Sequence, residues 1–211
     1  MSNIDRVMEI AYSQIGVEED ATGRVKYSDE YGLPRQPWCM MFLWWCYLKA
    51  GLSDIFYGGN KTASCGALYR WALREGYVVD KGKRGDIVIW SFRKTKDGSR
   101  ETSHCGLVST CNASTTTSVE GNTCKIGSQD NGGKVMEQTR NNKYVRAYIR
   151  LPYPDSGVDD YITYTVKKGD SLWKISKQFY GTGLKWKKIY DDNQLTSTTL
   201  HVNQLLYIRK E

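Results

Sequence analysis

The chain has 211 residues, 40% of them apolar and 12% aromatic, so it is long enough for one or two domains and too apolar to be generally disordered. No apolar stretch approaches the roughly 20 residues of a membrane span, and the N-terminal residues lack the apolar centre of a signal peptide, so we expect synthesis in a cytoplasm and no membrane insertion. The net charge is +7 and is concentrated in residues 162–211, which suits an anionic polymer, although a solvated basic face is the commoner explanation.

Three helices and then four strands are predicted in the first part of the chain. Apolar residues at helical spacing predict a helix over residues 4–15. Pro37 suits the first position of a second helix, which is apolar on every side and is followed by Gly51, so we expect this helix to be central and buried. A third helix is predicted over residues 65–76. The predicted strands are residues 85–92, 104–110, 115–122 and 145–151. Helices followed by antiparallel strands predict an α+β domain.

A domain boundary is predicted at the stretch "YPDSGVDD", where Pro, Gly, Ser and acids interrupt the apolar pattern. We place one domain at residues 1–152, a linker at residues 153–161 and a second domain at residues 162–211. The second domain reads as a strand, two helices and a closing strand, a small βααβ unit. At about 50 residues it is near the lower limit for a self-supporting core.

Cys39 follows Pro37 and Trp38 and lies in the first turn of the predicted central helix. Unpaired amide groups and the helix dipole favour an anion there, so a thiol at this position is a candidate nucleophile. The alternative is a packing role, because unpaired Cys behaves as a small hydrophobe. The other cysteines are expected to be reduced core or strand residues without a disulfide or metal role: Cys46, Cys65, Cys105, Cys111 and Cys124.

His104 is the only histidine of the first predicted domain, and a thiol nucleophile needs a base. If residues 104–110 and 115–122 form a hairpin that turns about Asn112, His104 lies directly opposite Glu120, within hydrogen-bond reach. Asn122 follows two residues later on the same face. A carboxylate on one ring nitrogen fixes the tautomer of the histidine, so these residues predict a Cys–His–Glu arrangement. The alternative reading makes Glu120 an exposed strand-end carboxylate and Asn122 a turn residue.

The strings "PWCMMFLWWC", "RGDIVIW", "SHCGLV" and "SVEGNT" together resemble the CHAP family of cysteine, histidine-dependent amidohydrolases and peptidases over roughly residues 1–152. The resemblance implies a papain-like α+β fold that cleaves amide bonds in bacterial peptidoglycan. It implies that Cys39 is the nucleophile, His104 the general base and acid, Glu120 the orienting carboxylate and Asn122 an auxiliary polar residue.

Some members of this family bind calcium through an acidic loop upstream of the cysteine. The corresponding stretch here is "VEEDATG", which lacks the alternating acids of such a loop. We therefore expect Glu18, Glu19 and Asp20 to form a solvated turn, and we expect no metal and no cofactor.

The strings "YTVKKGDSLWKISKQFYG", "WKKIYDDN" and "LLYIRK" resemble a LysM module over essentially its whole length. The resemblance implies binding to glycans that contain N-acetylglucosamine, in a groove between two loops. The groove residues it implies are Gly169, Asp170, Ser171 and Leu172 on one side and Asn193, Gln194 and Leu195 on the other. Gly169 and Ser171 also read as a turn residue and an N-cap.

The two resemblances predict a monomeric peptidoglycan hydrolase that acts on glycan and stem peptide, with the LysM module as its anchor. Either the N-acetylmuramoyl-L-alanine amide or a peptide bond could be cut, and the residues do not distinguish them. The expected setting is a phage endolysin, made in the host cytoplasm without a signal peptide and acting on the wall after release. The alternative is a glycan-binding or virion structural protein without catalysis. Nucleic acid is not expected as a partner, because no groove-reading motif accompanies the positive charge.

Overall fold

The structure is a computed structural model, and it describes residues 2–93, 98, 100–125, 132–154, 161–193, 195, 197–202 and 204–209. The chain divides into two compact units, an N-terminal unit of residues 3–154 and a C-terminal unit that begins at residue 155. Most of the predicted linker, residues 155–160, lies outside the described residues. In the part of the chain that the structure describes, none of the helices has the length and apolar character to cross a membrane.

Helices form the first half of the N-terminal unit: α1 (Asn3–Ser13), α2 (Lys26–Tyr31), α3 (Cys39–Lys49), the 3₁₀ helix η1 (Ser53–Gly59) and α4 (Cys65–Arg74). The three predicted helices correspond to α1, α3 and α4. The prediction for Pro37 is wrong, because α3 begins at Cys39. Trp38 is its N-cap, with φ of −115° and ψ of 13°, so the backbone becomes helical only at Cys39 and places that residue at the first helical position.

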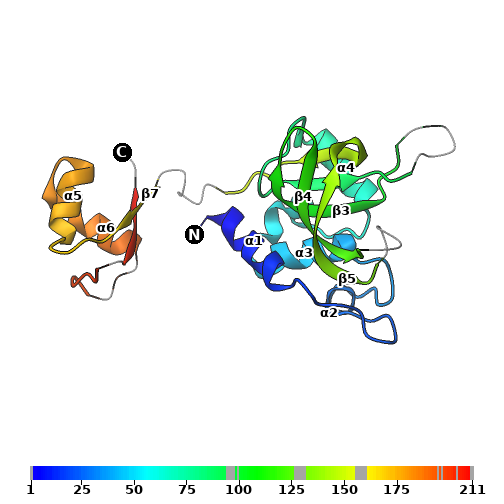
Figure 1. Cartoon of the computed structure of the whole chain (residues 1–211), viewed down its shortest axis with the longest axis horizontal. Helices are drawn as coiled ribbons and strands as arrows, with labels where there is room; N and C mark the ends of the chain where they lie inside the picture. Colours follow the sequence, from blue (N-terminus) through cyan, green and yellow to red (C-terminus); the bar gives the residue numbers. More distant parts are fainter. Residues whose placement is uncertain are drawn as a thin grey trace. The chain divides into compact units, whose positions relative to one another are not determined.

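Strands form the second half of the unit: β1 (Val78–Val79), β2 (Ile87–Trp90), β3 (His104–Cys111), β4 (Thr115–Thr123), β5 (Lys134–Asn141) and, after the 3₁₀ helix η2 (Asn142–Tyr144), β6 (Val145–Ile149). They make one antiparallel sheet with the order β1-β6-β2-β3-β4-β5. The α+β prediction is confirmed. Figure 1 shows the helices gathered beside this sheet.

The two faces of the sheet belong to different apolar clusters. Ile87 and Ile89 of β2 pack into the main core together with α1, α3 and α4. The alternate residues Val88 and Trp90 belong to a smaller cluster with Val108. This alternation follows from the two-residue period of a strand, and it determines which side chains can meet on each face.

The register of the β3–β4 hairpin differs from the prediction. Leu107 pairs with Val119, not with Thr117 as the predicted turn about Asn112 required. The pairing also shifts between Val108 and Thr110, where one strand carries a bulge. His104 is therefore not directly opposite Glu120, although the two side chains do meet, as described below.

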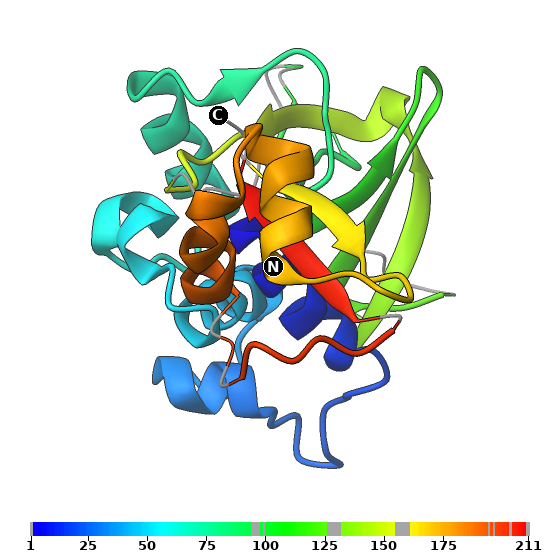
Figure 2. The same ribbon diagram turned by 90° about the vertical axis from the view of Figure 1, so that its left-hand side faces the viewer.

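The C-terminal unit contains β7 (Tyr161–Thr165), α5 (Leu172–Tyr180), the 3₁₀ helix η3 (Gly183–Lys185), α6 (Trp186–Asp192) and β8 (Leu205–Arg209). β7 and β8 pair antiparallel, and both helices lie on one face of this pair (Figures 1 and 2). The βααβ prediction is confirmed. Its core consists of Val166, Leu172, Ile175, Ile189, Leu206 and Ile208.

Candidate active site

Cys39 is held at the start of α3 by contacts of the residues around it. Trp38 Nε1 donates a hydrogen bond of 2.6 Å to Glu19 Oε1. Strand β4 passes very close to the first turns of the helix, because a Cβ atom at Gly121 would lie 2.6 Å from Cβ of Phe42 and 2.7 Å from the ring of Trp38. The glycine thus lets β4 approach α3, and the thiol is fixed relative to the sheet.

Three thiols converge at this point. The Sγ atoms of Cys39, Cys65 and Cys105 all lie within 4.8 Å of one another, and those of Cys39 and Cys65 are 3.9 Å apart. Cys65 is the first residue of α4, just as Cys39 is the first residue of α3. Two helix N-termini therefore meet at one sulfur cluster, and their dipoles favour a thiolate there.

The Cys39 thiol is the member of this cluster that ionises most readily. Hydrogen bonds from the thiols of Cys105 and Cys65 lower the pKa of Cys39, burial raises it, and the hydrogen bond and charge of His104 lower it again. The net result is a pKa well below the usual range. Burial, and then the hydrogen bonds and charges of Cys39 and Cys65, raise the pKa of Cys105. A hydrogen bond from Cys105 lowers the pKa of Cys65, but the hydrogen bond to Cys39, burial and the Cys39 charge outweigh it and raise the pKa overall. Cys39 therefore carries the negative charge.

His104 and Glu120 form a buried hydrogen bond of 3.0 Å between Nε2 and Oε2. Gly106 makes this contact possible. A Cβ atom at that position would lie 2.7 Å from Oγ of Ser118 and 2.8 Å from Cγ of Glu120. The Glu120 side chain therefore occupies the space above Gly106, and its carboxylate reaches diagonally to the imidazole, which is why the pair forms despite the shifted register.

Glu120 is also bound to Arg140 on the neighbouring strand β5. The carboxylate accepts from Nε at 3.0 and 3.2 Å and from Nη2 at 2.6 Å, which is a bidentate arrangement. Ser118 Oγ donates to the same carboxylate at 2.8 Å. The guanidinium also lies 4.9 Å from the ring centre of Phe92. Arg140 and Ser118 therefore fix the orientation of the Glu120 carboxylate, which in turn holds His104.

The charges of this network explain the ionisation of its members. Burial raises the pKa of Glu120, but hydrogen bonds to His104 and Arg140 and their charges outweigh it, so the pKa is lowered overall. Burial lowers the pKa of His104, whereas the Cys39 thiolate and Glu120 raise it to about 9. Nε2 is held by Glu120, so Nδ1 is the ring nitrogen that remains to interact with the Cys39 thiol. Nδ1 is therefore available for proton transfer.

Asn122 has a structural role beside the auxiliary one that the resemblance implies. Its backbone is left-handed, with φ of 56°, at the irregularity between Glu120 and Thr123. Its Oδ1 accepts a hydrogen bond of 3.3 Å from the amide of Gly133, and its carbonyl accepts one of 2.9 Å from Gly132. It ties β4 to the chain before β5. Its auxiliary catalytic role stays a prediction.

The acidic stretch before α2 is held by protein contacts. Glu18 forms an ion pair of 3.0 Å with Lys134, and Glu19 accepts from Trp38. Asp20 Oδ1 accepts hydrogen bonds from the amides of Thr22 and Arg24, which also lower its pKa. Glu19 therefore connects this loop to the start of α3, and Asp20 stabilises the loop itself.

In the C-terminal unit, the residues of the implied groove shape their own loops. Gly169 has φ of +87°, and Asp170 Oδ2 accepts hydrogen bonds from Tyr164 Oη at 2.7 Å and from the amide of Lys167 at 2.8 Å. Ser171 caps α5 by accepting from Lys174, whereas Leu172 is buried in the core. The first side of the groove is therefore a turn stabilised by Asp170.

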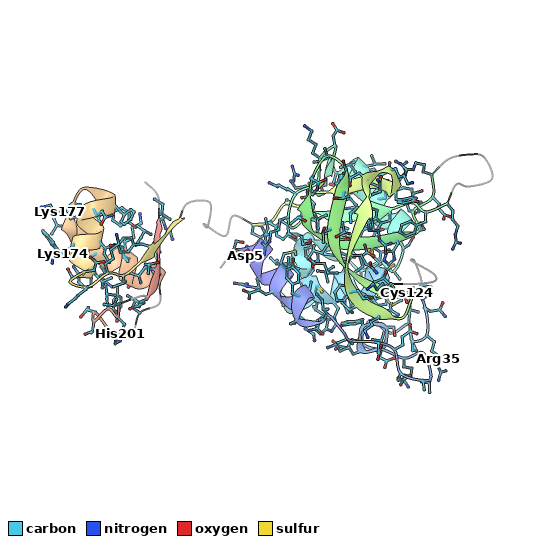
Figure 3. The ribbon with its side chains drawn as sticks, viewed as in Figure 1. Asp5, Arg35, Cys124, Lys174, Lys177 and His201 are labelled. Atoms are coloured by element: carbon cyan, nitrogen blue, oxygen red, sulfur yellow. The ribbon has the colours of Figure 1, made fainter. Side chains whose placement is uncertain are left out.

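On the second side, Asn193 Nδ2 donates to the carbonyl of Ile189, and Leu195 packs against the core of the unit. Gln194 lies outside the described residues. Trp173 is 50% exposed on α5, from which the labelled Lys174 and Lys177 also project (Figure 3).

Arg140, Gly106 and the thiols of Cys65 and Cys105 were not predicted as site residues. Arg140 belongs to β5, which was not predicted either, because only Val135 of that strand is fully buried. The stretch "KVMEQTRN" has no regular alternation of apolar and polar residues that would mark a strand. Nothing in the sequence brings Cys65 and Cys105 to Cys39, since they come from separate elements.

Comparisons with known proteins match two domain families. Residues 29–122 match the CHAP domain, and residues 164–209 match the LysM domain. An uncharacterised Bacillus subtilis protein, YqbP, is 56% identical over 32 residues, which are 15% of this chain and 15% of that protein. The chain thus spans only a small part of this curated relative.

Solved structures also resemble the chain. The endolysin LysIME-EF1 aligns with a TM-score of 0.42 and 20% identity, over 74% of this chain and 67% of that one. The peptidoglycan hydrolase RipB from Mycobacterium tuberculosis aligns with a TM-score of 0.40 and 18% identity, over 70% of this chain and 64% of that one. A Staphylococcus aureus protein described as similar to a lipoprotein of the NLP/P60 family aligns with a TM-score of 0.38 and 10% identity, over 71% of this chain and 41% of that one.

Proposed function

Since the chain carries a CHAP domain followed by a LysM domain, we propose that it is a peptidoglycan hydrolase in which the first domain cuts an amide bond and the second holds the enzyme on glycan. The observation that carries this proposal is the convergence of Cys39, His104 and Glu120. A low-pKa thiol lies at a helix N-terminus, and a buried imidazole with a raised pKa is oriented by a carboxylate.

The reaction begins with the Cys39 thiolate and the His104 imidazolium. The thiolate attacks the carbonyl carbon of the amide, and the resulting oxyanion accepts a hydrogen bond from the backbone N–H of Cys39, which has no acceptor within the first turn of the helix. His104 then donates its proton to the leaving amine, which leaves a thioester on Cys39. Water attacks the thioester while His104 takes its proton, and the acid product and the thiolate–imidazolium pair are restored.

Glu120 contributes to each step through His104. It holds the ring by Nε2, so that the other nitrogen serves the sulfur and the substrate, and it stabilises the imidazolium. Arg140 in turn keeps Glu120 ionised and fixed. Glu120 and Arg140 are therefore positioning residues in this proposal.

We propose domain limits of residues 1–152 and 162–211 with the linker 153–161, and a monomeric chain. Binding of the second domain to glycan raises the local concentration of bonds for the first, without changing the chemistry. In this arrangement the proposed biological role is that of an endolysin, which clears the wall from a lysing bacterium.

The decisive experiment compares how fast the wild-type chain and the Cys39→Ala variant reduce the turbidity of a suspension of purified bacterial cell walls. We expect Cys39→Ala to be inactive and still to sediment with the walls. Cys46→Ala, which removes another buried thiol from the same helix, is the matched control and is expected to keep activity. Equal clearing by Cys39→Ala would remove the thiol from the mechanism and favour the non-catalytic alternative.

The bond that is cut follows from mass spectrometry of the released fragments. New amino termini on L-alanine identify an amidase that separates the stem peptide from the sugar. New termini within the stem or cross-bridge identify an endopeptidase.

A further inference from the structure

The convergence of Cys65 and Cys105 on Cys39 is more than the proposed hydrolysis needs, since a Cys–His–Glu mechanism uses one thiol. All three are buried, with 5% of Cys39, 7% of Cys65 and none of Cys105 exposed. They come from α3, α4 and β3, so the fold has assembled them in space. A cluster of three thiols is a ligand set that soft d¹⁰ metal ions prefer.

The distances agree with such a ligand set. A tetrahedral Zn²⁺ ion with Zn–S bonds of about 2.3 Å places its sulfurs about 3.8 Å apart. The Sγ atoms of Cys39 and Cys65 are already 3.9 Å apart, and all three sulfurs lie within 4.8 Å of one another. The two edges to Cys105 therefore need to shorten by at most about 1 Å to fit such an ion.

The surroundings of the cluster favour thiolate ligands. Cys39 and Cys65 each occupy the first position of a helix, and these helices have 11 and 10 residues. The partial positive charges of two helix N-termini therefore offset part of the negative charge that three thiolates bring to a buried site. Nδ1 of His104, the ring nitrogen that Glu120 does not hold, is a further nitrogen donor next to the cluster.

We propose that Cys39, Cys65 and Cys105 form a binding site for a thiophilic d¹⁰ metal ion, with Zn²⁺ as the ligand. Cys39 binds as the thiolate that it already is, whereas Cys65 and Cys105 each release a proton to solvent as their Zn–S bonds form. The remaining position of the tetrahedron is open to a fourth donor. Because Cys39 belongs to the ligand set, the bound ion occupies the sulfur lone pair that would attack the substrate. Metal binding and thiol chemistry at Cys39 therefore exclude each other.

The site is tested on the full chain, reduced and freed of metal with a chelator, by titration with Cd²⁺. Cadmium–thiolate bonds absorb in the ultraviolet by charge transfer, so the amplitude counts the bound sulfurs. We expect saturation at one ion per chain with the amplitude of three thiolates. Zn²⁺ is then expected to displace the bound Cd²⁺ at one ion per chain, so that the cadmium–thiolate band disappears. Absence of the thiolate band from the wild-type chain overturns the proposal without any variant.

Variants assign the ligands. Cys65→Ala and Cys105→Ala are expected to weaken Zn²⁺ binding by at least about 100-fold in competition with a chromophoric chelator. Cys46→Ala is the matched control, because it also removes a fully buried thiol but lies outside the cluster. Wild-type affinity in both Cys65→Ala and Cys105→Ala would place the bound ion elsewhere on the chain and refute the site.

Alkylation gives an independent measurement. Zn²⁺ is expected to slow the alkylation of Cys39 by iodoacetamide at least about tenfold, and a chelator is expected to restore the original rate. The extent of alkylation is measured from the mass of the peptide that contains Cys39. Unchanged alkylation in the presence of bound Zn²⁺ would contradict the assignment of Cys39 as a ligand. Neither readout uses wall hydrolysis, so the metal site and the proposed hydrolase can fail separately.

Discussion

Arg140 Nη2 lies 2.6 Å from Oε2 of Glu120, and the guanidinium approaches the same carboxylate with Nε at 3.0 Å. Glu120 therefore stands between two cations, Arg140 on one side and His104 on the other. Both partners of the ion pair are largely buried, with side-chain exposures of 8% and 0%. The histidine is thus positioned by a buried network that reaches across three strands, from β3 to β5.

Replacing Glu120 by Gln tests the orienting carboxylate. The amide keeps the size of the side chain but loses the charge that stabilises the imidazolium. We therefore expect the rate of wall clearing to fall by at least about 100-fold, while the variant still binds the cell walls. Glu137→Gln is the control, since this exposed carboxylate on β5 contacts Tyr12 and Ser109 instead. Comparable rates in the two variants would show that the charge of Glu120 is dispensable.

Replacing Arg140 by Ala leaves a buried carboxylate with one cation fewer and removes the packing against Phe92. We expect the free energy of unfolding to fall by about 3 kcal/mol, measured by urea denaturation. Arg24→Ala is the comparison, because the ion pair of Arg24 with Asp29 is solvent-exposed and such pairs contribute less than about 1 kcal/mol. A loss for Arg140→Ala as small as that for Arg24→Ala would mean that Glu120 is adequately held by the remaining partners.

The sequence predicts well those helices and strands whose apolar residues recur with a clear local spacing. The stripe of α1, the apolar run of α3 and the strands β2 and β3 bury whole faces, and their residues follow the expected spacing. The strand β5 was missed because most of its side chains are polar and only Val135 is fully buried. Arg140 was therefore missed with it.

The Cys–His–Glu prediction rested on the helix start at Cys39, the lone histidine and a hairpin register, and the predicted register is wrong. The strand register places Leu107 opposite Val119, so the direct opposition of His104 and Glu120 does not occur. Register is set by turn and bulge geometry, which local periodicity does not determine. His104 and Glu120 still meet because Gly106 has no side chain, which leaves room for Glu120 to reach the imidazole diagonally.

Replacing Gly106 by Ala tests that explanation. The added Cβ would lie 2.8 Å from Cγ of Glu120, so the carboxylate has to move away from His104. We expect loss of wall clearing by at least about tenfold and destabilisation of about 1–3 kcal/mol from overpacking. Gly66→Ala is the control, because its added Cβ would keep at least 3.0 Å from its nearest neighbours, whereas that of Gly106 would come within 2.7 Å, and because Ala favours a helix. Full activity of Gly106→Ala would show that Glu120 reaches His104 by another route.

The stability of the N-terminal unit should depend on pH through Glu120. The pKa of this carboxyl is lowered from its usual 4.5 in the folded chain, so folding favours the ionised form. The resulting stabilisation is fully present above about pH 4.5 and is lost as the pH falls through the folded pKa. We expect the difference in free energy of unfolding between wild type and Glu120→Gln to shrink on acidification from about pH 6 to about pH 3. Parallel curves for the two proteins would contradict a lowered pKa.

Replacing Asp170 by Ala tests the implied glycan groove. Asp170 holds the turn around Gly169 through Tyr164 and Lys167, so its loss should disorder one side of the groove while the buried Leu172 keeps the unit folded. In a Cys39→Ala background that prevents digestion, we expect about fivefold weaker co-sedimentation with insoluble peptidoglycan. Asp191→Ala is the control, because that exposed carboxylate forms its ion pair with Lys187, one turn away on the same helix. Equal co-sedimentation of the two variants would place the glycan on another surface of the C-terminal unit.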